Sequence, residues 1–439
     1  NMKHILLIGA GKSATVLIHF LIELVQNKNW HLTVADGNEQ LLNDKVKTSK
    51  NVSILVLKID NELERKQAIA SADIVISMMP PHLHYLIAID CMEFNKHLLT
   101  ASYVDEKIQA LAKTIKEKNL LFLCEMGLDP GIDHMSAMKL IHEIKEKGGN
   151  IVSFKSHCGG LIAPESDDNP WHYKISWNPK NIILAGKAGA TYLENGKVVK
   201  LPYEALFKNN ISVTTSNNKY AYYPNRDSLN YISIYQLQQI KTFVRTTLRH
   251  PQFCTGWNMI INLQLTNEVK QYQTNGLSIA KFFETHFKEF NCHEFLKEIK
   301  KNDSLHQQLL FIGLNDKDTI INKGLCNAAE VLQFILEKKL VLNNADKDLI
   351  VMLHEFEYLL HNKKYYVTSL LELAGKDNQQ TAMAKTVGLP LGIAAKLILE
   401  NKITTTGLHI PILPEIYLPV LEELQNYGIS FNEDSSEIS

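Results

Sequence analysis

The feature that most constrains the fold is a regular alternation of apolar runs and helical patterns over the first 125 residues. Six runs are typical of strands: His4 to Gly9, Leu32 to Ala35, Val52 to Leu57, Ile74 to Met78, His97 to Thr100 and Leu120 to Cys124. Between the first two runs, apolar residues recur at helical spacing from Ala14 through Leu17, Leu21 and Leu24 to Val25. Such alternation indicates βαβ units. We therefore expect an α/β fold with a Rossmann-type, doubly wound parallel sheet.

Length and composition indicate a globular protein of about two or three domains. The chain has 439 residues, of which 45% are hydrophobic and 21% are charged. Its 46 basic and 47 acidic residues give a net charge of −1, and like charges form no block. We therefore expect no nucleic-acid partner and a small-molecule substrate.

Membrane, export and metal-binding signals are not found in the sequence. The longest apolar run, around Thr15 to Val25, is shorter than the roughly 18 residues that a membrane helix needs. No export signal precedes the first strand, and the six cysteines form no C-x-x-C pair. His82 and His84 share a short proline-bounded loop without a metal-binding motif. We expect a cytoplasmic protein with free thiols, no membrane association and no metal site.

A glycine-rich turn follows the first strand and predicts a dinucleotide site. Gly9, Gly11 and Ala14 form a G-x-G-x-x-A pattern, and Lys12 and Ser13 lie within it. At this position the amides of a helix N-terminus can face a pyrophosphate. Asp36 ends the next strand, where a carboxylate can accept both ribose hydroxyls and repel a 2′-phosphate, so NAD is favoured over NADP. The alternative is a glycine turn and a strand-ending acid without a ligand.

The ends of the later strands supply further candidates, because these ends face the ligand crevice of a doubly wound sheet. Ser77, Met78 and Pro80 close the fourth strand and are expected to line the nicotinamide side, although an ordinary turn explains them about equally well.

Two longer segments follow the fifth and sixth strands. Ser102, Tyr103 and Asp129 are expected to emerge at the same crevice edge. For Asp129 the alternative is a helix N-cap before Pro130, and Tyr103 can simply pack.

From Ile151 onward the pattern changes and predicts a second, α+β domain. Short strand-like pieces at Ile182 to Leu184, Thr191 to Leu193, Lys197 to Lys200 and Ile211 to Thr215 suggest a mixed sheet. Residues 278 to 343 are rich in Lys and Glu and predict a helical insertion, which a strand pair at 349 to 371 and a helix at 382 to 399 follow. We expect a dinucleotide-binding domain over 1–128, completed by 385–439, and a substrate domain over 129–384.

Residues 157 to 179 combine a thiol, glycines, prolines, charges and aromatics without amphipathic periodicity, which is typical of a site rather than a core. Cys158 is either a polarised thiol there or, as residue type alone favours, a small core hydrophobe. Arg226 and Arg245 stand in a chain that is poor in arginine, and a guanidinium suits bidentate carboxylate binding. A structural salt bridge is the alternative for each arginine.

Segments spread over nearly the whole chain resemble the saccharopine dehydrogenase (L-glutamate-forming) family, also called saccharopine reductase. They are TASYV, GLDPGIDHM, CGGLIAPE, NPWHYKISWNP, YPNRDS, RTTLRHPQFC, TAMAKTVGLP and EIYLPVLEELQNYGI. Carboxynorspermidine and lysine dehydrogenases are close relatives of this family, and the CGGLIAPE and arginine-bearing segments favour the saccharopine branch. The sequence departs from the family where Ile162 replaces a common Pro, His157 a common Tyr, and Thr246 a Gly that usually follows the arginine.

The resemblance implies roles for the candidate residues. Tyr103, Asp129 and Cys158 would surround the reacting amine with Ser102 nearby, and Arg226 and Arg245 would hold substrate carboxylates. The implied reaction of lysine metabolism is oxidative cleavage of saccharopine to L-glutamate and 2-aminoadipate 6-semialdehyde, or its reverse, in a homodimer. The alternatives are a carboxynorspermidine or lysine dehydrogenase and a non-catalytic dinucleotide-binding protein. The family's C-terminal segment also folds back to complete the cofactor domain.

Overall fold

The computed structural model describes residues 2–215 and 218–438, which form two compact units. Unit 1 comprises residues up to 149 together with 379–432, and unit 2 comprises 150–378 together with the residues after 432. The predicted domain ranges instead place residues 129–149 with the second part of the chain. These residues group with unit 1 because the helix that they form packs on a helix near the C-terminus, where His142 Nδ1 and Tyr417 OH are 2.7 Å apart.

Unit 1 contains the predicted Rossmann-type sheet. Its seven strands are all parallel, in the order β18-β6-β5-β4-β1-β2-β3. They are β1 (His4–Ile8), β2 (His31–Asp36), β3 (Val52–Val56), β4 (Ile74–Ser77), β5 (His97–Thr100), β6 (Leu121–Leu123) and β18 (Gly407–His409). The six strands predicted from the N-terminal alternation are confirmed, and the seventh comes from the C-terminal part of the chain.

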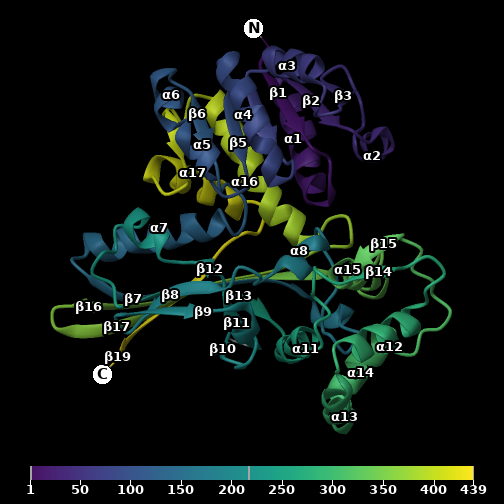
Figure 1. The fold of residues 1–439 in the computed structure, drawn as a ribbon. Coiled ribbons are helices and arrows are strands. Elements are labelled where there is room, and N and C mark those ends of the chain that lie inside the picture. Colours follow the sequence, from purple (N-terminus) through teal and green to yellow (C-terminus); the bar gives the residue numbers. More distant parts are fainter. Residues whose placement is uncertain (1, 216–217, 439) are drawn as a thin grey trace. The chain divides into compact units, whose positions relative to one another are not determined.

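Helices cover both faces of this sheet, as Figure 1 shows. They are η1 (Lys12–Ala14), α1 (Thr15–Lys28), α2 (Glu39–Lys45), α3 (Glu62–Ser71), η2 (Pro81–Leu83), α4 (His84–Glu93), α5 (Glu106–Ala110), α6 (Ala112–Glu117), α7 (Ile132–Glu146), α16 (Ala382–Leu399) and α17 (Pro414–Gln425). The predicted apolar positions of α1 are buried, which confirms its helical periodicity. Helix α16 packs on α1, where Gly388 and Gly392 let the two helices approach closely.

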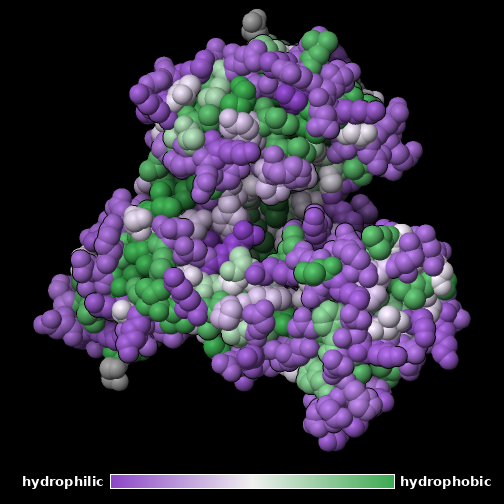
Figure 2. All heavy atoms as spheres, in the orientation of Figure 1, coloured by the Kyte–Doolittle hydropathy of each residue, from purple (hydrophilic) through white to green (hydrophobic). Residues whose placement is uncertain are grey.

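Helix α16 is also long and apolar enough to cross a membrane, and within the described residues it is the single such helix. The expectation that the segment from Thr15 to Val25 is the longest apolar run is therefore wrong. Of the α16 residues that meet this criterion, 83% are buried inside the protein, so packing within unit 1 explains the apolar composition. Figure 2 shows mainly hydrophilic side chains on the drawn face of each unit, with hydrophobic ones in smaller groups.

Unit 2 is built on a mixed sheet of ten strands. The main path is β10-β11-β13-β7-β16-β17-β19, and β8, β9 and β12 branch from it. The strands are β7 (Asn150–Ile162), β8 (Ala190–Glu194), β9 (Lys197–Leu201), β10 (Ser212–Thr214), β11 (Lys219–Pro224), β12 (Arg226–Asp227), β13 (Thr242–Arg249), β16 (Asp348–Leu360), β17 (Lys363–Ala374) and β19 (Asn432–Ile438). Strands β13 and β7 are parallel, whereas β16 is antiparallel to both β7 and β17.

The remaining elements of unit 2 are mostly helices, and they include the predicted insertion. They are η3 (Pro164–Ser166), α8 (Lys180–Leu184), α9 (Tyr203–Leu206), α10 (Asn230–Ile234), α11 (Pro251–Asn262), β14 (Gln271–Gln273), α12 (Ile279–Glu289), α13 (His293–Lys301), α14 (Asp303–Phe311), β15 (Leu325–Asn327) and α15 (Ala328–Lys339). The mixed sheet and the helical insertion confirm the predicted α+β fold.

Two predictions about unit 2 are wrong. The strand expected at Ile182 to Leu184 is helix α8, because the chain turns at Pro179 and the two isoleucines pack into the aromatic core beside α15. Residues 157 to 179 are not purely a site segment either. Strand β7 continues to Ile162, and Trp171 and Tyr173 are buried in the core of unit 2.

Candidate active site

The glycine turn after β1 has the backbone geometry that a dinucleotide site needs. Gly9 has a φ of 104°, and a Cβ at this position would lie 3.0 Å from the backbone of Met78. Its N–H donates to the carbonyl oxygen of Ala35 at 2.8 Å, so the turn is held against β2. A side chain at position 9 would therefore be strained twice, by its φ and by the contact with Met78.

Gly11 lies beside open space at the start of the helical segment. No atom lies within 4 Å of the position that a Cβ would occupy there, so protein packing does not require a glycine. Lys12 is exposed, Ser13 is half-buried and Ala14 is buried as η1 leads into α1. The turn and the space above it fit the close approach of a pyrophosphate to backbone amides.

Asp36 is held by backbone amides. Its Oδ2 accepts a hydrogen bond from the N–H of Ala10 at 2.8 Å, and its Oδ1 accepts one from the N–H of Asn38 at 2.9 Å. Lys45 lies close by and donates to the carbonyl oxygen of Gly11 at 2.7 Å. Burial lowers the pKa of Lys45, the charge of Asp36 opposes this shift, and the charge of Lys12 adds to it. The carboxylate therefore fixes the turn, and two lysines bring positive charge to it.

The loop after β4 contains the three candidates Ser77, Met78 and Pro80. The N–H of Met78 donates to the carbonyl oxygen of Ile8 at 2.8 Å, and Pro80 is exposed. The Ser77 side chain is buried, and its hydroxyl is 2.9 Å from Nδ1 of His84. Ser77 thus contributes to the structure of the loop through His84.

Ser102 and Tyr103 follow β5 in a loop that hydrogen bonds hold on both sides. Ser102 Oγ lies 2.8 Å from His84 Nε2, and its N–H donates to Thr100 Oγ1 at 3.0 Å. The Ser102 carbonyl oxygen accepts a hydrogen bond from the N–H of Glu125, at the end of β6, at 3.0 Å. Tyr103 is half-buried beside it.

His84 contacts two candidate residues, Ser77 and Ser102, although the sequence analysis weighed it only as a metal ligand. Burial lowers its pKa to about 4, the charge of Asp105 opposes this shift and that of His82 adds to it, so the ring is neutral at physiological pH. The sequence offered no signal for these contacts, because the hydroxyls that His84 contacts belong to β4, to β5 and to the loop after β5.

Asp129 lies in the segment between β6 and α7 and is half-buried. Its peptide bond to Pro130 is cis, and α7 begins at Ile132 with Gly131 at the N-cap position. The alternative that Asp129 caps this helix is therefore wrong. A buried pair that the sequence analysis missed lies nearby in the chain, with His134 Nε2 2.7 Å from Glu125 Oε2.

The strand order places the unit 1 candidates at one edge of its sheet. Strands β6, β5, β4, β1 and β2 are successive neighbours, and the candidates follow their carboxyl ends. That these residues line a ligand crevice at this edge stays a prediction.

In unit 2, Cys158 and Arg245 share one face of the sheet. Cys158 lies within β7 and pairs with Thr247 of β13, and Arg245 is two residues before Thr247 on the same strand. Because alternate residues of a strand face the same side, all three side chains point to one face. Cys158 is 6% exposed and Arg245 is 5% exposed, so this face is buried around them.

The two predicted arginines occupy different surroundings. The Arg245 guanidinium lies over the ring of Tyr231, 4.5 Å from its centroid, and the Arg245 N–H donates to Ser228 Oγ. Arg226 is exposed, has a φ of 52° and belongs to β12. The residue before it, Asn225, donates its N–H to the Arg245 carbonyl oxygen at 2.8 Å. One backbone hydrogen bond therefore links the chain next to Arg226 with Arg245.

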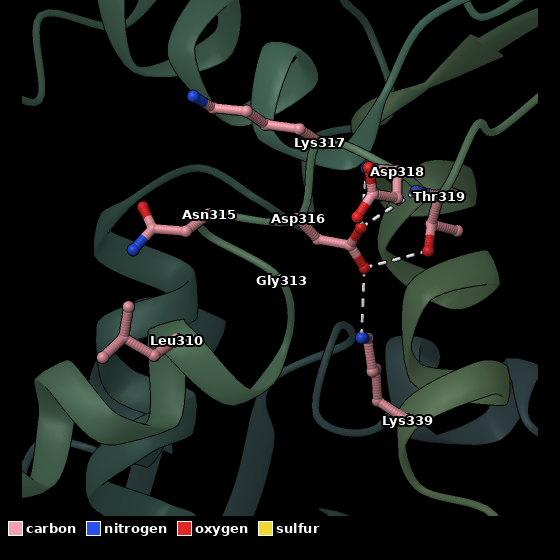
Figure 3. A pocket seen from close by; sticks show the side chains of 8 residues that line it. All are labelled: Leu310, Gly313, Asn315, Asp316, Lys317, Asp318, Thr319 and Lys339. Carbon is pink, nitrogen blue, oxygen red and sulfur yellow. Dashed lines mark hydrogen bonds and ion pairs between the residues drawn. The ribbon is translucent and has the colours of Figure 1, made fainter.

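A separate polar pocket of about 670 Å³ lies in the helical insertion. Figure 3 shows its lining residues, which include none of the predicted site residues. Asp316 accepts hydrogen bonds there from the N–H and the hydroxyl of Thr319 and from Lys339. The backbone hydrogen bond from Thr319 is the main cause that lowers the Asp316 pKa to about 2. These bonds fix the loop between α14 and α15.

The fold and the glycine turn define the class of the protein as a Rossmann-type dinucleotide-binding protein with an added α+β unit. Two family models match the chain: the saccharopine dehydrogenase NADP binding domain over residues 5–123 and the saccharopine dehydrogenase C-terminal domain over residues 127–429. The chain therefore belongs to the saccharopine dehydrogenase family, as the sequence motifs indicated.

Relatives and a solved structure agree with this assignment. Saccharopine dehydrogenase (NADP+, L-glutamate-forming) of Saccharomyces cerevisiae is 30% identical over 98% of this chain and 99% of its own length. Alpha-aminoadipic semialdehyde synthase of Arabidopsis thaliana is 32% identical over 98% of this chain and 44% of its own length. The chain thus spans about half the length of the synthases that it matches. The apo structure of saccharopine dehydrogenase (L-Glu forming) from S. cerevisiae matches with a TM-score of 0.86 at 28% identity, covering 99% of this chain and all of that one.

The expectation of NAD in preference to NADP is wrong. The N-terminal family model describes an NADP binding domain, and the fungal relatives are named for NADP+. In the structure, both oxygens of the Asp36 carboxylate accept hydrogen bonds from the backbone, one from Ala10 and one from Asn38. Lys45 carries positive charge near Asp36, and the charge of Lys12 also acts on Lys45.

Proposed function

We propose that this chain is a saccharopine dehydrogenase (L-glutamate-forming) that uses NADP. The proposal depends mainly on one observation: the chain aligns end to end with fungal enzymes of that name at about 30% identity. The dinucleotide geometry of unit 1 and the buried arginine and thiol of unit 2 support it.

The reaction is proposed to oxidise the carbon–nitrogen bond of saccharopine to an imine, which water then cleaves to L-glutamate and 2-aminoadipate 6-semialdehyde. NADP+, when bound, supplies the hydride acceptor. In this chain the turn from Gly9 to Ala14 would hold the pyrophosphate, and Lys12 and Lys45 would face the 2′-phosphate. Arg226 and Arg245 would hold substrate carboxylates and thereby orient the amine.

Proton transfer is assigned to Asp129, Cys158 and Tyr103. Loss of hydride from a secondary amine requires the amine nitrogen to lose its proton, and carbinolamine collapse requires the nitrogen to gain one. A carboxylate, a thiol and a phenol are each able to serve as proton donor or acceptor in such steps. The buried position of Cys158 beside Thr247 limits the access of bulk water to the thiol.

The purified chain, mixed with saccharopine and NADP+, is expected to produce reduced nicotinamide, which is followed by its absorbance. Turnover of carboxynorspermidine or lysine instead of saccharopine would assign the chain to another branch. Binding of NADPH without turnover of any of these amines would indicate a non-catalytic protein.

Arg245→Met is expected to raise the KM for saccharopine about 10- to 100-fold, because a charged hydrogen-bond partner of a carboxylate is lost. The dissociation constant of NADPH is expected to stay within twofold of the wild-type value. Lys317→Met, in the separate pocket of the insertion, is the matched control for loss of a positive charge. Equal saccharopine kinetics for Arg245→Met and wild type would contradict the assignment.

A homodimer and a cytoplasmic location complete the proposal. Analytical ultracentrifugation tests the homodimer, and a single species with the 49.8 kDa mass of one chain would contradict it.

All six cysteines are free and buried, which agrees with the predicted thiols.

A further inference from the structure

Glu125, just after β6, combines a strained backbone with a buried carboxylate. Its φ is 54°, in the left-handed region that residues other than glycine seldom adopt, and the residue is 4% exposed. Over residues 2–215 and 218–438, it is the one buried residue among the non-glycine residues with a positive φ, whereas the others are exposed or half-buried. Backbone strain of this kind costs free energy and persists where the surrounding contacts impose it.

The contacts of Glu125 hold the two peptide groups that flank Tyr103. Its N–H donates to the carbonyl oxygen of Ser102 at 3.0 Å, and its Oε1 accepts a hydrogen bond from the N–H of Val104 at 3.3 Å. A peptide group is planar, so holding the groups on both sides of a residue restricts its φ and ψ and the direction of its side chain. Glu125 therefore determines how Tyr103 leaves the backbone.

His134 holds the Glu125 carboxylate from the first turn of α7. Its Nε2 lies 2.7 Å from Glu125 Oε2, and the ring is completely buried. An ionised carboxylate only accepts hydrogen bonds, so the ring donates through an Nε2–H. The neighbouring Asp133 fixes the same turn of the helix, where its Oδ1 accepts a hydrogen bond from the N–H of Gly131 at 2.6 Å. The loop that carries Tyr103 is therefore anchored to a helix through Glu125.

We propose that Glu125 and His134 are positioning residues that hold Tyr103 in the orientation needed for proton transfer. The inference rests on the proposed function, which assigns proton transfer to Tyr103 together with Asp129 and Cys158. Such a step requires the donor and acceptor atoms to lie within hydrogen-bond reach. A displacement of about 1 Å can cost about 100-fold in rate, so a buried pair that acts only through the backbone of Tyr103 is able to control kcat.

The first test compares kcat and KM for saccharopine, with NADP+, between wild type and variants of the pair. Glu125→Met removes both carboxylate oxygens and is expected to lower kcat about 10- to 100-fold, while KM stays within about threefold of wild type. Glu125→Gln is expected to keep most of kcat, because its amide can accept from Val104 and donate to the other tautomer of the His134 ring. Equal losses of kcat in Glu125→Gln and Glu125→Met would contradict positioning through these hydrogen bonds.

A double-mutant cycle with Tyr103→Phe separates positioning from a merely structural role. If the pair acts by placing the phenol, Glu125→Met should lower kcat by no more than about threefold once the phenol is absent. Losses that simply multiply in the double variant would show that Glu125 does not act through Tyr103 and would overturn the inference. His134→Leu takes the place of Glu125→Met in the cycle if that variant does not fold.

The matched control is Asp90→Asn, which alters a buried ion pair elsewhere in unit 1. Asp90 Oδ2 lies 2.6 Å from Arg65 Nε, and both side chains are buried. This variant is expected to unfold at a lower temperature than wild type but to keep kcat within about twofold. A loss of kcat as large as that of Glu125→Met would show that turnover follows the stability of unit 1, which contradicts a specific positioning role.

Hydrogen–deuterium exchange of the ligand-free protein tests the same contacts without turnover. The Val104 amide is expected to exchange about 10-fold faster in Glu125→Met than in wild type, because its acceptor is lost, whereas the amides of β1 keep their rates. Unchanged exchange at Val104 would overturn the inference even if the proposed function holds. If wild type does not turn over saccharopine, the proposed function fails, and the exchange at Val104 alone decides whether the pair holds the loop.

Discussion

His84 joins three hydroxyl groups from two neighbouring strands of unit 1. Its Nδ1 contacts Ser77 at the end of β4, and its Nε2 contacts Ser102 at 2.8 Å and Thr100 at 3.2 Å, at the end of β5. A neutral imidazole can donate from one nitrogen and accept at the other, which suits hydroxyl partners on both sides. The ring therefore fixes the start of the loop that carries Tyr103.

The lowered pKa of His84 is expected to make stability depend on pH. The folded state has a pKa of about 4 against a usual value of 6.5, so between these values the unfolded state binds the extra proton. The neutral His84 ring makes its full contribution to the free energy of unfolding above pH 6.5. That contribution falls by about 3 kcal/mol as the pH drops to 4, so the protein becomes less stable. In urea unfolding at successive pH values, we expect His84→Leu to lose less stability over this range than wild type does.

His82→Leu is the matched control, because His82 is exposed and lies two residues before His84, in η2. Its stability is expected to fall with pH as steeply as that of wild type. Parallel pH profiles for His84→Leu and wild type would show that the ring is not held neutral by the fold.

Two departures from the family pattern are hydrogen-bond partners of each other. His157 Nδ1 and Thr246 Oγ1 are 2.7 Å apart, and His157 is completely buried. The other ring nitrogen of His157 donates to Glu355 Oε2 at 2.7 Å. Both departures therefore belong to one buried network, on the face of the sheet opposite to Cys158.

Thr246→Gly is expected to lower the free energy of unfolding by about 1 to 3 kcal/mol, because it leaves a buried nitrogen of His157 without a partner. The double variant His157→Tyr with Thr246→Gly restores the residues that the family commonly has and is expected to regain most of this loss. Urea unfolding measures both effects. Additive losses in the double variant would contradict a compensating pair.

At the scale of elements, the contact between α1 and α16 depends on residues without side chains. A Cβ on Gly388 would lie 2.9 Å from the Cβ of Leu17, and a Cβ on Gly392 would lie 2.5 Å from Cδ1 of Phe20. Both approaches are closer than ordinary van der Waals contact, so the two helices cannot keep this distance with larger residues.

Gly392→Leu is expected to destabilise unit 1 by at least 1 to 3 kcal/mol, since the added atoms overpack the contact with α1. Combining it with Phe20→Ala creates space on the facing helix and is expected to recover part of the loss. Thermal unfolding followed by circular dichroism provides the measurement. Full additivity of the two changes would show that the helices do not share this contact.

The sequence predicted elements well where periodicity carries the information. The strands of unit 1 follow apolar runs that neighbouring strands and helices bury on both faces, which is a local and regular signal. Ile182 to Leu184 was misassigned because three apolar residues have no distinguishable period. Cys158 was placed in an irregular segment because the glycines after it hide the strand. In the structure, Gly159 is needed for the close approach of Leu248, 2.6 Å from where a Cβ would lie.

The candidate site was predictable only in part, because sequence periodicity and topology do not specify which side chains contact each other. Residues that follow strand ends, such as Ser102 and Asp129, could be proposed because topology alone brings strand ends together. The contact of His84 with Ser102 and the pair of Glu125 and His134 depend on how side chains pack, which strand topology does not specify.

At the scale of the whole molecule, NADPH is expected to protect unit 1 selectively. In hydrogen–deuterium exchange, ligand binding should slow the amides of residues 9–15 and of the loop after β4, because these amides lie at the proposed phosphate site. The amides of β16 and β17 in unit 2 are expected to exchange at unchanged rates. Protection confined to unit 2 would contradict the placement of the cofactor.

Gly11→Leu provides the matched control for this measurement. Apart from its chain neighbours, no heavy atom lies within 4 Å of the Cβ position at residue 11, so the fold is expected to stay within about 0.5 kcal/mol of wild type. The same side chain would occupy the space proposed for the pyrophosphate, and the NADPH-dependent protection is expected to disappear. Retained protection in this variant would show that the dinucleotide does not bind beside Gly11.

Two stretches that lie far apart in the sequence together form unit 1, so this unit cannot be completed early in synthesis. The ribosome makes the apolar face of α1 early, because α1 lies in the first stretch, which ends at residue 149. Helix α16, which packs on α1, belongs to the second stretch, 379–432, which begins about 230 residues later. At roughly 5 to 20 residues per second, a ribosome needs about 10 to 50 s to make that interval. During this time the nascent dinucleotide-binding unit lacks α16 and β18, so it is expected to be a substrate for chaperones that bind exposed apolar helices on the ribosome.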